Sequence, residues 1–183
     1  MSKTIKSDIY EYLGRLWKVN SKESGLRTNI LRCLLGQFHY MLGRHRKVFV
    51  CRFDLSVHYY TETNELMAML FRRLSRRIKI YYGTDLTYCW VREHKPSTEA
   101  QHYHCCVFLN GSKVNQPYIL QWLLKMIWSP YFGRCHWAGY HNLDRHNQLE
   151  LQDATFHVSY LAKTRTKGYR APQTKDYGHS RIT

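Results

Sequence analysis

The feature that most limits the possible folds is a strict alternation of apolar and other residues over 47–59. Apolar side chains occupy every second position of this run, and Arg52 and Asp54 stand at intervening positions. Because successive side chains of a strand point to opposite faces, the run predicts a strand with one buried face and one more polar face. Similar alternation over 86–94 and 101–110 predicts two further strands.

Between these runs, apolar residues recur three and four positions apart, which is the spacing of one helix face. The predicted helices are 63–80, one that starts after Asn115 and ends near Ser129, and 154–165 behind an Asp153 cap. A fourth strand with poorer alternation is expected around 134–142. The predicted fold is therefore α+β, with a four- to five-stranded antiparallel sheet in β-α-β-β-α-β-α order. In this ferredoxin-like or RRM-like arrangement two helices cover one sheet face, and the other face is expected to be open.

The chain order divides the protein into three predicted segments. Residues 1–46 form an N-terminal basic segment with a helix over about 25–44, and residues 47–165 form the β/α domain. Residues 166–183 form a basic C-terminal tail that we expect to be loosely ordered.

The charge balance points to a polyanionic partner. The chain carries 28 Lys and Arg against 13 Asp and Glu, which gives a formal charge of +15. This excess is typical of proteins that bind nucleic acid. No apolar run is long enough for a membrane span, and the N-terminus does not resemble a secretion signal. We therefore expect a cytoplasmic protein with no membrane partner.

Polar residues gather on one face of the predicted strands. His102 and His104 are two positions apart, so both imidazoles project to the same side, and Glu93 precedes them across a short hairpin. Two imidazoles and a carboxylate suit Mn²⁺ or Mg²⁺ and would also accept Zn²⁺ or Co²⁺. Asp54 and Arg52 are expected to support these ligands. A His-x-His spacing is also common by chance, so an ordinary surface or hydrogen-bonded pair is the alternative.

The last predicted helix carries a candidate nucleophile. Tyr160 and Lys163 are three positions apart and share a helix face, with His157 one turn earlier. A phenol beside an ammonium and a metal can act as a nucleophile, because positive charge stabilises the phenolate. Taken alone, a core tyrosine beside a solvated lysine explains the same pattern.

The order of these motifs resembles the HUH endonuclease superfamily of rolling-circle replication initiators. In more detail it resembles the inovirus-type replication proteins that include the YagK/YfjJ C-terminal-domain family. The resemblance covers roughly residues 47–181. It rests on the segments Arg52–Val57, Trp90–Glu93, His102–His104, Tyr160–Lys163 and Tyr177–Arg181, the last similar to a terminal FGxSR-type signature.

The resemblance implies a metal-dependent enzyme that nicks and joins single-stranded DNA. His102, His104 and Glu93 would bind the metal, Tyr160 would form a 5′-phosphotyrosine, and Lys163 would steady the negative charge. The DNA partner would be a single-stranded or hairpin replication origin of a phage or prophage-like element in a bacterial host. Because the chain has no P-loop, a host helicase and polymerase would be needed. The expected DNA-binding residues are Arg165, Lys167, Arg170 and Lys175.

Other functions fit part of the pattern. A non-catalytic RRM-like module would share the fold and the charge, but it would carry aromatic rings where this chain has His102 and His104. An HUH transposase or relaxase would share the chemistry and differ in its DNA. Four arginines at 72, 73, 76 and 77 would add to a DNA surface, although a solvated helix face is the usual explanation of such a run.

Overall fold

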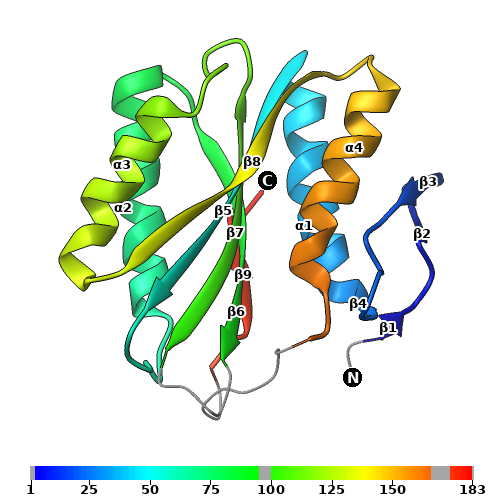
Figure 1. The fold of residues 1–183 in the computed structure, drawn as a ribbon. Helices are drawn as coiled ribbons and strands as arrows, with labels where there is room; N and C mark the ends of the chain where they lie inside the picture. Colours follow the sequence, from blue (N-terminus) through cyan, green and yellow to red (C-terminus); the bar gives the residue numbers. More distant parts are fainter. Residues whose placement is uncertain (1–2, 95–99, 166–173, 183) are drawn as a thin grey trace.

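The structure, a computed structural model, describes residues 3–94, 100–165 and 174–182. It is an α+β fold built on a five-stranded antiparallel sheet, as the sequence predicts. Helices lie on both faces of this sheet (Figure 1). The strands of the sheet are β5 (Lys47–Val57), β6 (Leu86–His94), β7 (Gln101–Asn110), β8 (Arg134–Asp144) and β9 (Tyr177–His179). Its helices are α1 (Thr28–Arg44), α2 (Glu65–Tyr82), α3 (Tyr118–Trp128) and α4 (Gln148–Ser159). No helix in the described ranges is both long and apolar enough to cross a bilayer.

The strand order β8-β5-β7-β6-β9 confirms the predicted split arrangement. β5 and β7 lie in the centre and pair over ten residues, with Asp54 directly opposite His104. β6 and β8 flank them, and β9 pairs with the outer edge of β6.

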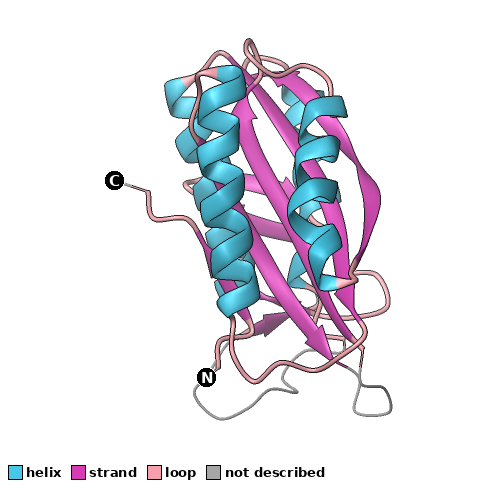
Figure 2. Cartoon of the chain, turned by 90° about the vertical axis from the view of Figure 1, so that its left-hand side faces the viewer, coloured by secondary structure: helices cyan, strands magenta, loops and turns pink. Residues whose placement is uncertain are grey.

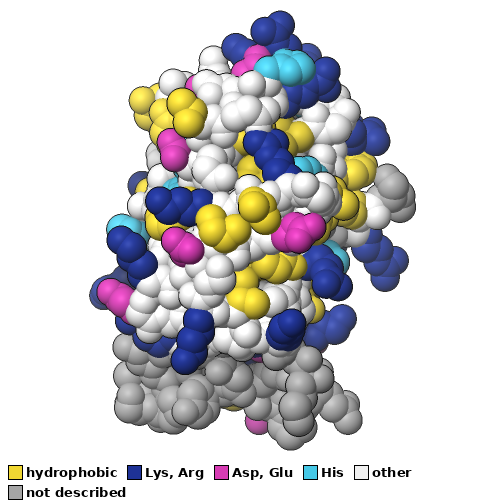
Figure 3. Space-filling model, turned by 90° about the vertical axis from the view of Figure 1, so that its right-hand side faces the viewer, with side chains coloured by type: hydrophobic (Ala, Val, Ile, Leu, Met, Phe, Trp, Pro, Cys, Tyr) yellow, Lys and Arg dark blue, Asp and Glu magenta, His cyan; other side chains and the backbone are white. Residues whose placement is uncertain are grey.

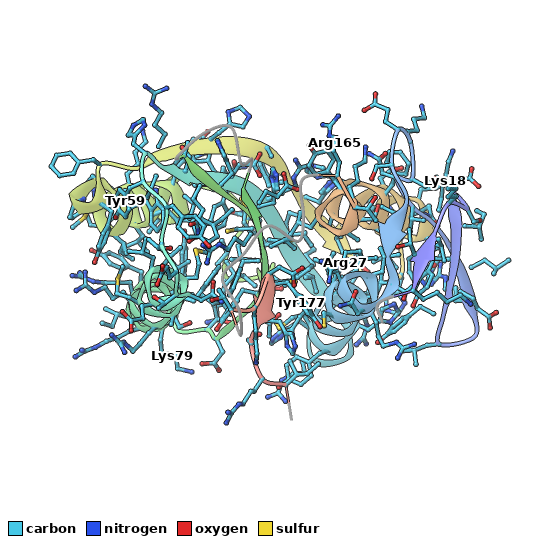
Figure 4. All side chains as sticks on the ribbon, turned by 90° about the horizontal axis from the view of Figure 1, so that it is seen from below. Lys18, Arg27, Tyr59, Lys79, Arg165 and Tyr177 are labelled. Atoms are coloured by element: carbon cyan, nitrogen blue, oxygen red, sulfur yellow. The ribbon has the colours of Figure 1, made fainter. Side chains whose placement is uncertain are left out.

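The alternation of the strands separates two apolar cores. Phe49, Phe53 and Tyr103 point to the face covered by α2 and α3, which Figure 2 shows lying across the strands. Val50 and Phe108 point to the opposite face, where they pack with α1 and α4. The expectation of an open second face was therefore wrong. Seen from below, the sheet stands between the two helix layers (Figure 4).

The N-terminal region contributes directly to this second layer. The apolar face of α1 is buried against β6 and β7, because Ile30, Leu34 and Phe38 recur at helical spacing. Before α1, the chain forms two small antiparallel pairs that the sequence analysis did not predict: β1 (Thr4–Ile5) with β4 (Leu26–Arg27), and β2 (Ile9–Tyr12) with β3 (Arg15–Lys18). The predicted segment boundaries at 46 and 165 stay predictions.

The last helix begins earlier and ends earlier than predicted. Asn147, not Asp153, is its N-cap and accepts a hydrogen bond from the backbone N–H of Glu150. α4 ends at Ser159, and a short 3₁₀ turn, η2 (Tyr160–Ala162), follows. A 3₁₀ turn, η1 (Ser129–Tyr131), likewise extends α3. Tyr160 therefore lies at the end of the helix and not within it.

The C-terminal end is an ordered part of the sheet, so the expected loose tail is wrong for residues 174–182. Gly178 pairs with Trp90 across the β9–β6 edge. Ser180 continues the contact: its hydroxyl donates to the Gln37 side chain and accepts from the backbone N–H of Tyr88. The Tyr177–Arg181 signature thus joins β6 to α1 and covers the edge of the sheet.

We expect Gly178→Ala to destabilise the fold. A Cβ at this position would lie 2.7 Å from ring atoms of Trp90, closer than van der Waals contact allows, and the indole is wedged in the core. Overpacking of this kind lowers the free energy of unfolding by about 1–3 kcal/mol, measurable by urea unfolding. Gly43→Ala is the matched control, because its Cβ would meet open space on α1 and should raise stability by about 0.4–1 kcal/mol. Equal effects of the two changes would contradict this role of Gly178.

Candidate functional site

A cluster of charged side chains spans the three inner strands on the α1/α4 face. His104 of β7 lies between two carboxylates: its Nδ1 is 2.7 Å from Asp54 Oδ1 on β5, and its Nε2 is 3.2 Å from Glu93 Oε2 on β6. All three side chains are largely shielded from solvent. The sequence analysis placed these residues on one face, and the register brings them into direct contact.

The cluster is electrostatically coupled. Burial alone would raise the pKa of Asp54, but the hydrogen bond and charge of His104, aided by Arg52, hold that pKa below its usual value. Burial alone would lower the pKa of His104, but its bonds to Asp54 and Glu93 raise it. Each group therefore favours the charged form of its partner.

Tyr160 packs directly on this cluster. Its ring centroid is 5.5 Å from that of His104, with the two rings nearly perpendicular. The guanidinium carbon of Arg52 is 4.0 Å from the ring centroid, and Lys163 Nζ is 5.0 Å from it. Three segments of the chain, each more than fifty positions from the next, thus bring a phenol, two cations and the histidine together.

Lys163 reaches the phenol by a different route from the one predicted. It follows η2 and forms an isolated bridge with Leu26, so it does not share a regular helix face with Tyr160. Its backbone N–H donates to the carbonyl of Tyr160, and the residue is buried. This turn holds the ammonium against the ring.

Two further histidines, His136 and His141, belong to the same face, and the sequence analysis missed them. His136 is opposite Asp54, and His141 is 3.0 Å from His157, between Nε2 and Nδ1. The β8 register shifts where Arg52 and Phe53 face it, so alternation along β8 changes phase there. A bulge of this kind is the reason that the poor alternation of residues 134–142 concealed them.

The candidate metal ligands of this face fit a metal ion only in part. Within the described ranges, no three His, Cys, Asp or Glu side chains are arranged to hold one. Two features nonetheless suit a metal. Asp54 orients His104 through Nδ1, as carboxylates do behind metal-bound histidines. His104 Nε2 and Glu93 Oε2 lie 3.2 Å apart, so two candidate ligands stand side by side, and a metal ion would displace the proton that pairs them. His102, exposed and opposite Glu93, is the remaining donor of the predicted set, and metal binding stays a prediction.

The predicted DNA-binding residues are placed only in part. Arg165, which follows the end of α4, is exposed (Figure 4), and its Nη1 lies 3.6 Å from Glu23 Oε2. Lys175 is also exposed. Lys167 and Arg170 lie outside the described residues. Lys and Arg side chains are also scattered over the face that carries α4 and the N-terminal strands (Figure 3). The run at Arg72–Arg77 belongs to α2 and lies on the other side of the sheet from Tyr160.

Comparison with protein families shows the family to which the chain belongs. The model of the YagK/YfjJ C-terminal domain matches residues 11–117, which is more than half of the chain. The chain belongs to the YagK/YfjJ C-terminal domain family. No curated protein and no solved structure matches it.

The YagK/YfjJ match differs in extent from the resemblance seen in the sequence. It begins at residue 11 and so includes α1, which packs on the sheet, whereas we expected similarity mainly from residue 47. It contains Glu93, His102 and His104 and ends before Tyr160. The metal-ligand candidates therefore lie within the part of the chain that shows the family.

His157 should make the stability of the fold depend on pH. Burial, the Arg52 cation and His141 lower its pKa to about 4, from a usual value near 6.5. As pH decreases from about 6.5 to 4, His157 takes up a proton in the unfolded chain but stays neutral in the folded one. Protonation therefore favours the unfolded chain, and the free energy of unfolding should fall over this range. Urea unfolding across this range should show a shallower fall for His157→Gln than for the unaltered chain. If the free energy of unfolding fell equally steeply with pH in both proteins, His157 would not be the group responsible.

Proposed function

We propose that this protein is an HUH-type DNA endonuclease and strand transferase that starts rolling-circle replication of a phage or prophage-like element. The observation that carries the proposal is the packing of Tyr160 against His104, 5.5 Å between ring centroids, while Asp54 and Glu93 hold both nitrogens of that imidazole. A nucleophile candidate and metal-ligand candidates from distant parts of the sequence meet in one place.

The side chains around Tyr160 suit attack on a phosphodiester. Tyr160 Oη would give up its proton to solvent and bond to phosphorus while the bond from phosphorus to the 3′ oxygen breaks. The 3′ oxygen would take up a proton from solvent, leaving a 5′-phosphotyrosine and a free 3′-OH. Arg52 and Lys163 would bind the phosphate and oppose its growing negative charge. Because the phosphotyrosine keeps the bond energy, the strand can be rejoined.

His104, His102 and Glu93 would hold the Mn²⁺ or Mg²⁺ that the reaction needs. The ion would polarise the scissile phosphate. Asp54 would act as a positioning residue, since its bond to His104 Nδ1 keeps Nε2 turned toward Glu93. Arg165 and Lys175, both exposed, would contact the DNA backbone beyond the site.

The arrangement of this sheet face disfavours the non-catalytic RRM-like alternative. RRM domains bind bases on an uncovered sheet with exposed aromatic rings. Here α1 and α4 cover the corresponding face, and its polar part carries imidazoles and carboxylates. A transposase or relaxase would use the same chemistry on another DNA, and only the substrate distinguishes it.

Tyr160→Phe should abolish nicking and the covalent adduct while leaving the fold intact, because it removes only the phenolic oxygen. The measurement is incubation with labelled single-stranded DNA and Mn²⁺, followed by denaturing electrophoresis, in which EDTA should also prevent the adduct. Tyr140→Phe is the matched control, because that exposed tyrosine stacks on Phe49 of the other sheet face. An adduct that persists in Tyr160→Phe would show that another residue is the nucleophile.

Asp54→Asn should weaken Mn²⁺ binding about 10- to 100-fold, as removal of a carboxylate behind a metal-bound histidine typically does. Calorimetric titration of the DNA-free protein measures this without relying on activity. Asp85→Asn is the control, since this exposed carboxylate forms an ion pair with Lys79 of α2, away from the Asp54 cluster. If Asp54→Asn and the unaltered chain bound Mn²⁺ equally, Asp54 would not position a ligand.

A further inference from the structure

A groove runs between α2 and α3 on the outer side of the helix layer, across the sheet from Tyr160. Its volume is about 490 Å³. Three arginines at 73, 76 and 77 form one wall, and apolar side chains complete it: Ile80, Leu123, Met126 and Ile127. The groove thus combines a strongly positive side with an aliphatic floor.

Two of the four apolar side chains that line the groove are open to solvent, while Leu123 and Ile127 are buried beneath them. Ile80 is 69% exposed and Met126 is 46% exposed. Beside them, Trp122 of α3 is 46% exposed and packs edge-to-face on Tyr81 of α2, with ring centroids 5.7 Å apart. Aromatic residues, Met and Arg are the residues enriched in the cores of protein interfaces.

The arginines have no local role that explains their concentration here. Among the described residues, no carboxylate forms an ion pair with Arg73, Arg76 or Arg77. Cations at three positions of one helix also repel one another, so the arrangement costs stability unless something negative binds. The positive charge of these arginines would be compensated by an acidic partner.

We propose that this groove binds an amphipathic helix of a partner protein, with acidic residues flanking an apolar stripe. Positions 73 to 80 span about 10 Å along α2, or two turns, so a helix of three to four turns would fill the groove. Its apolar stripe would cover Leu123, Met126 and Ile127, and its carboxylates would pair with the arginines. The groove lies on the side of the sheet opposite Tyr160, so the proposal does not rest on the endonuclease activity.

Other occupants fit less well. A second copy of this chain would bring the same arginines together, and the chain already carries a charge of +15. Single-stranded DNA is held by ring faces that stack on its bases, and none of the residues that line this groove is aromatic. An anionic membrane would favour a flat apolar face, and this surface is hollowed.

The test uses the full chain and a fluorescein-labelled helical peptide of about 14 residues, with leucines at i, i+3, i+4 and i+7 and flanking glutamates. Fluorescence anisotropy should show binding with a Kd of about 10 μM. The same peptide with lysines in place of glutamates should not bind. Absence of binding by the acidic peptide at concentrations near 1 mM would overturn the proposal.

Matched variants locate the binding on the chain. Arg76→Glu, in the groove wall, should raise the Kd of the acidic peptide about tenfold. Arg72→Glu, exposed on the same helix outside the groove, should change that Kd less than about twofold. Combined reversal of Arg73, Arg76 and Arg77 to Glu should allow the lysine peptide to bind instead. If Arg72→Glu and Arg76→Glu lost the same peptide affinity, the attraction would be nonspecific and the groove would not be the binding site.

Competition separates the other ligand classes. Oligo-dT and phosphatidylglycerol vesicles should leave the peptide bound to the groove and should bind Arg76→Glu as well as the unaltered chain. If either displaced the peptide and lost its own binding in Arg76→Glu, the groove would belong to DNA or to a membrane, and the proposal would be wrong. Thermal unfolding confirms that each variant is folded, which is expected because the changed side chains are exposed.

Discussion

The position of His104 between Asp54 and Glu93 is the constraint on which the site depends. Three neighbouring strands each supply one member, so the contact exists only when β5, β7 and β6 are in this register. Buried charges are costly unless they are paired, and here each carboxylate meets an imidazole nitrogen. A shift of one residue in either strand pair would turn one partner to the apolar core and leave the others unpaired. The electrostatics of the site and the register of the sheet therefore support each other.

The α1/α4 layer divides its sheet face into an apolar part and a polar part. Val50, Cys106 and Phe108 pack beneath the helices, whereas toward the end of the sheet where β7 begins the side chains become Arg52, then Asp54 and His104. Because α4 ends at Ser159, the next residue, Tyr160, is placed at the border between these parts. Helix length thus determines where the phenol meets the charged cluster.

The two sheet faces carry different surfaces. The α1/α4 face holds the charged cluster and Tyr160, and the α2/α3 layer carries on its outer side the groove lined by arginines. The edge of β6 is closed by β9, whose Gly178 allows close packing on Trp90. Separate locations for chemistry and for partner binding would let both occur at once on one small fold.

The sequence by itself determined the strands and their faces. The alternation of β5, β6 and β7 sufficed to place Arg52, Asp54, Glu93, His102 and His104 on one side, because a side-chain period of two follows from strand geometry alone. The helical spacing of 63–80 likewise predicted α2. The motifs and their order also resemble the YagK/YfjJ family, and the family match confirms this prediction.

Only the tertiary structure decided what covers that face and which residues meet there. The contact of Tyr160 with His104 depends on where α4 ends and how it packs, and no local spacing encodes either. His136 and His141 joined the face because a bulge in β8 shifts the alternation, and β9 formed because Gly178 fits against Trp90. These features arise from contacts between segments distant in sequence, where packing and register override the local pattern.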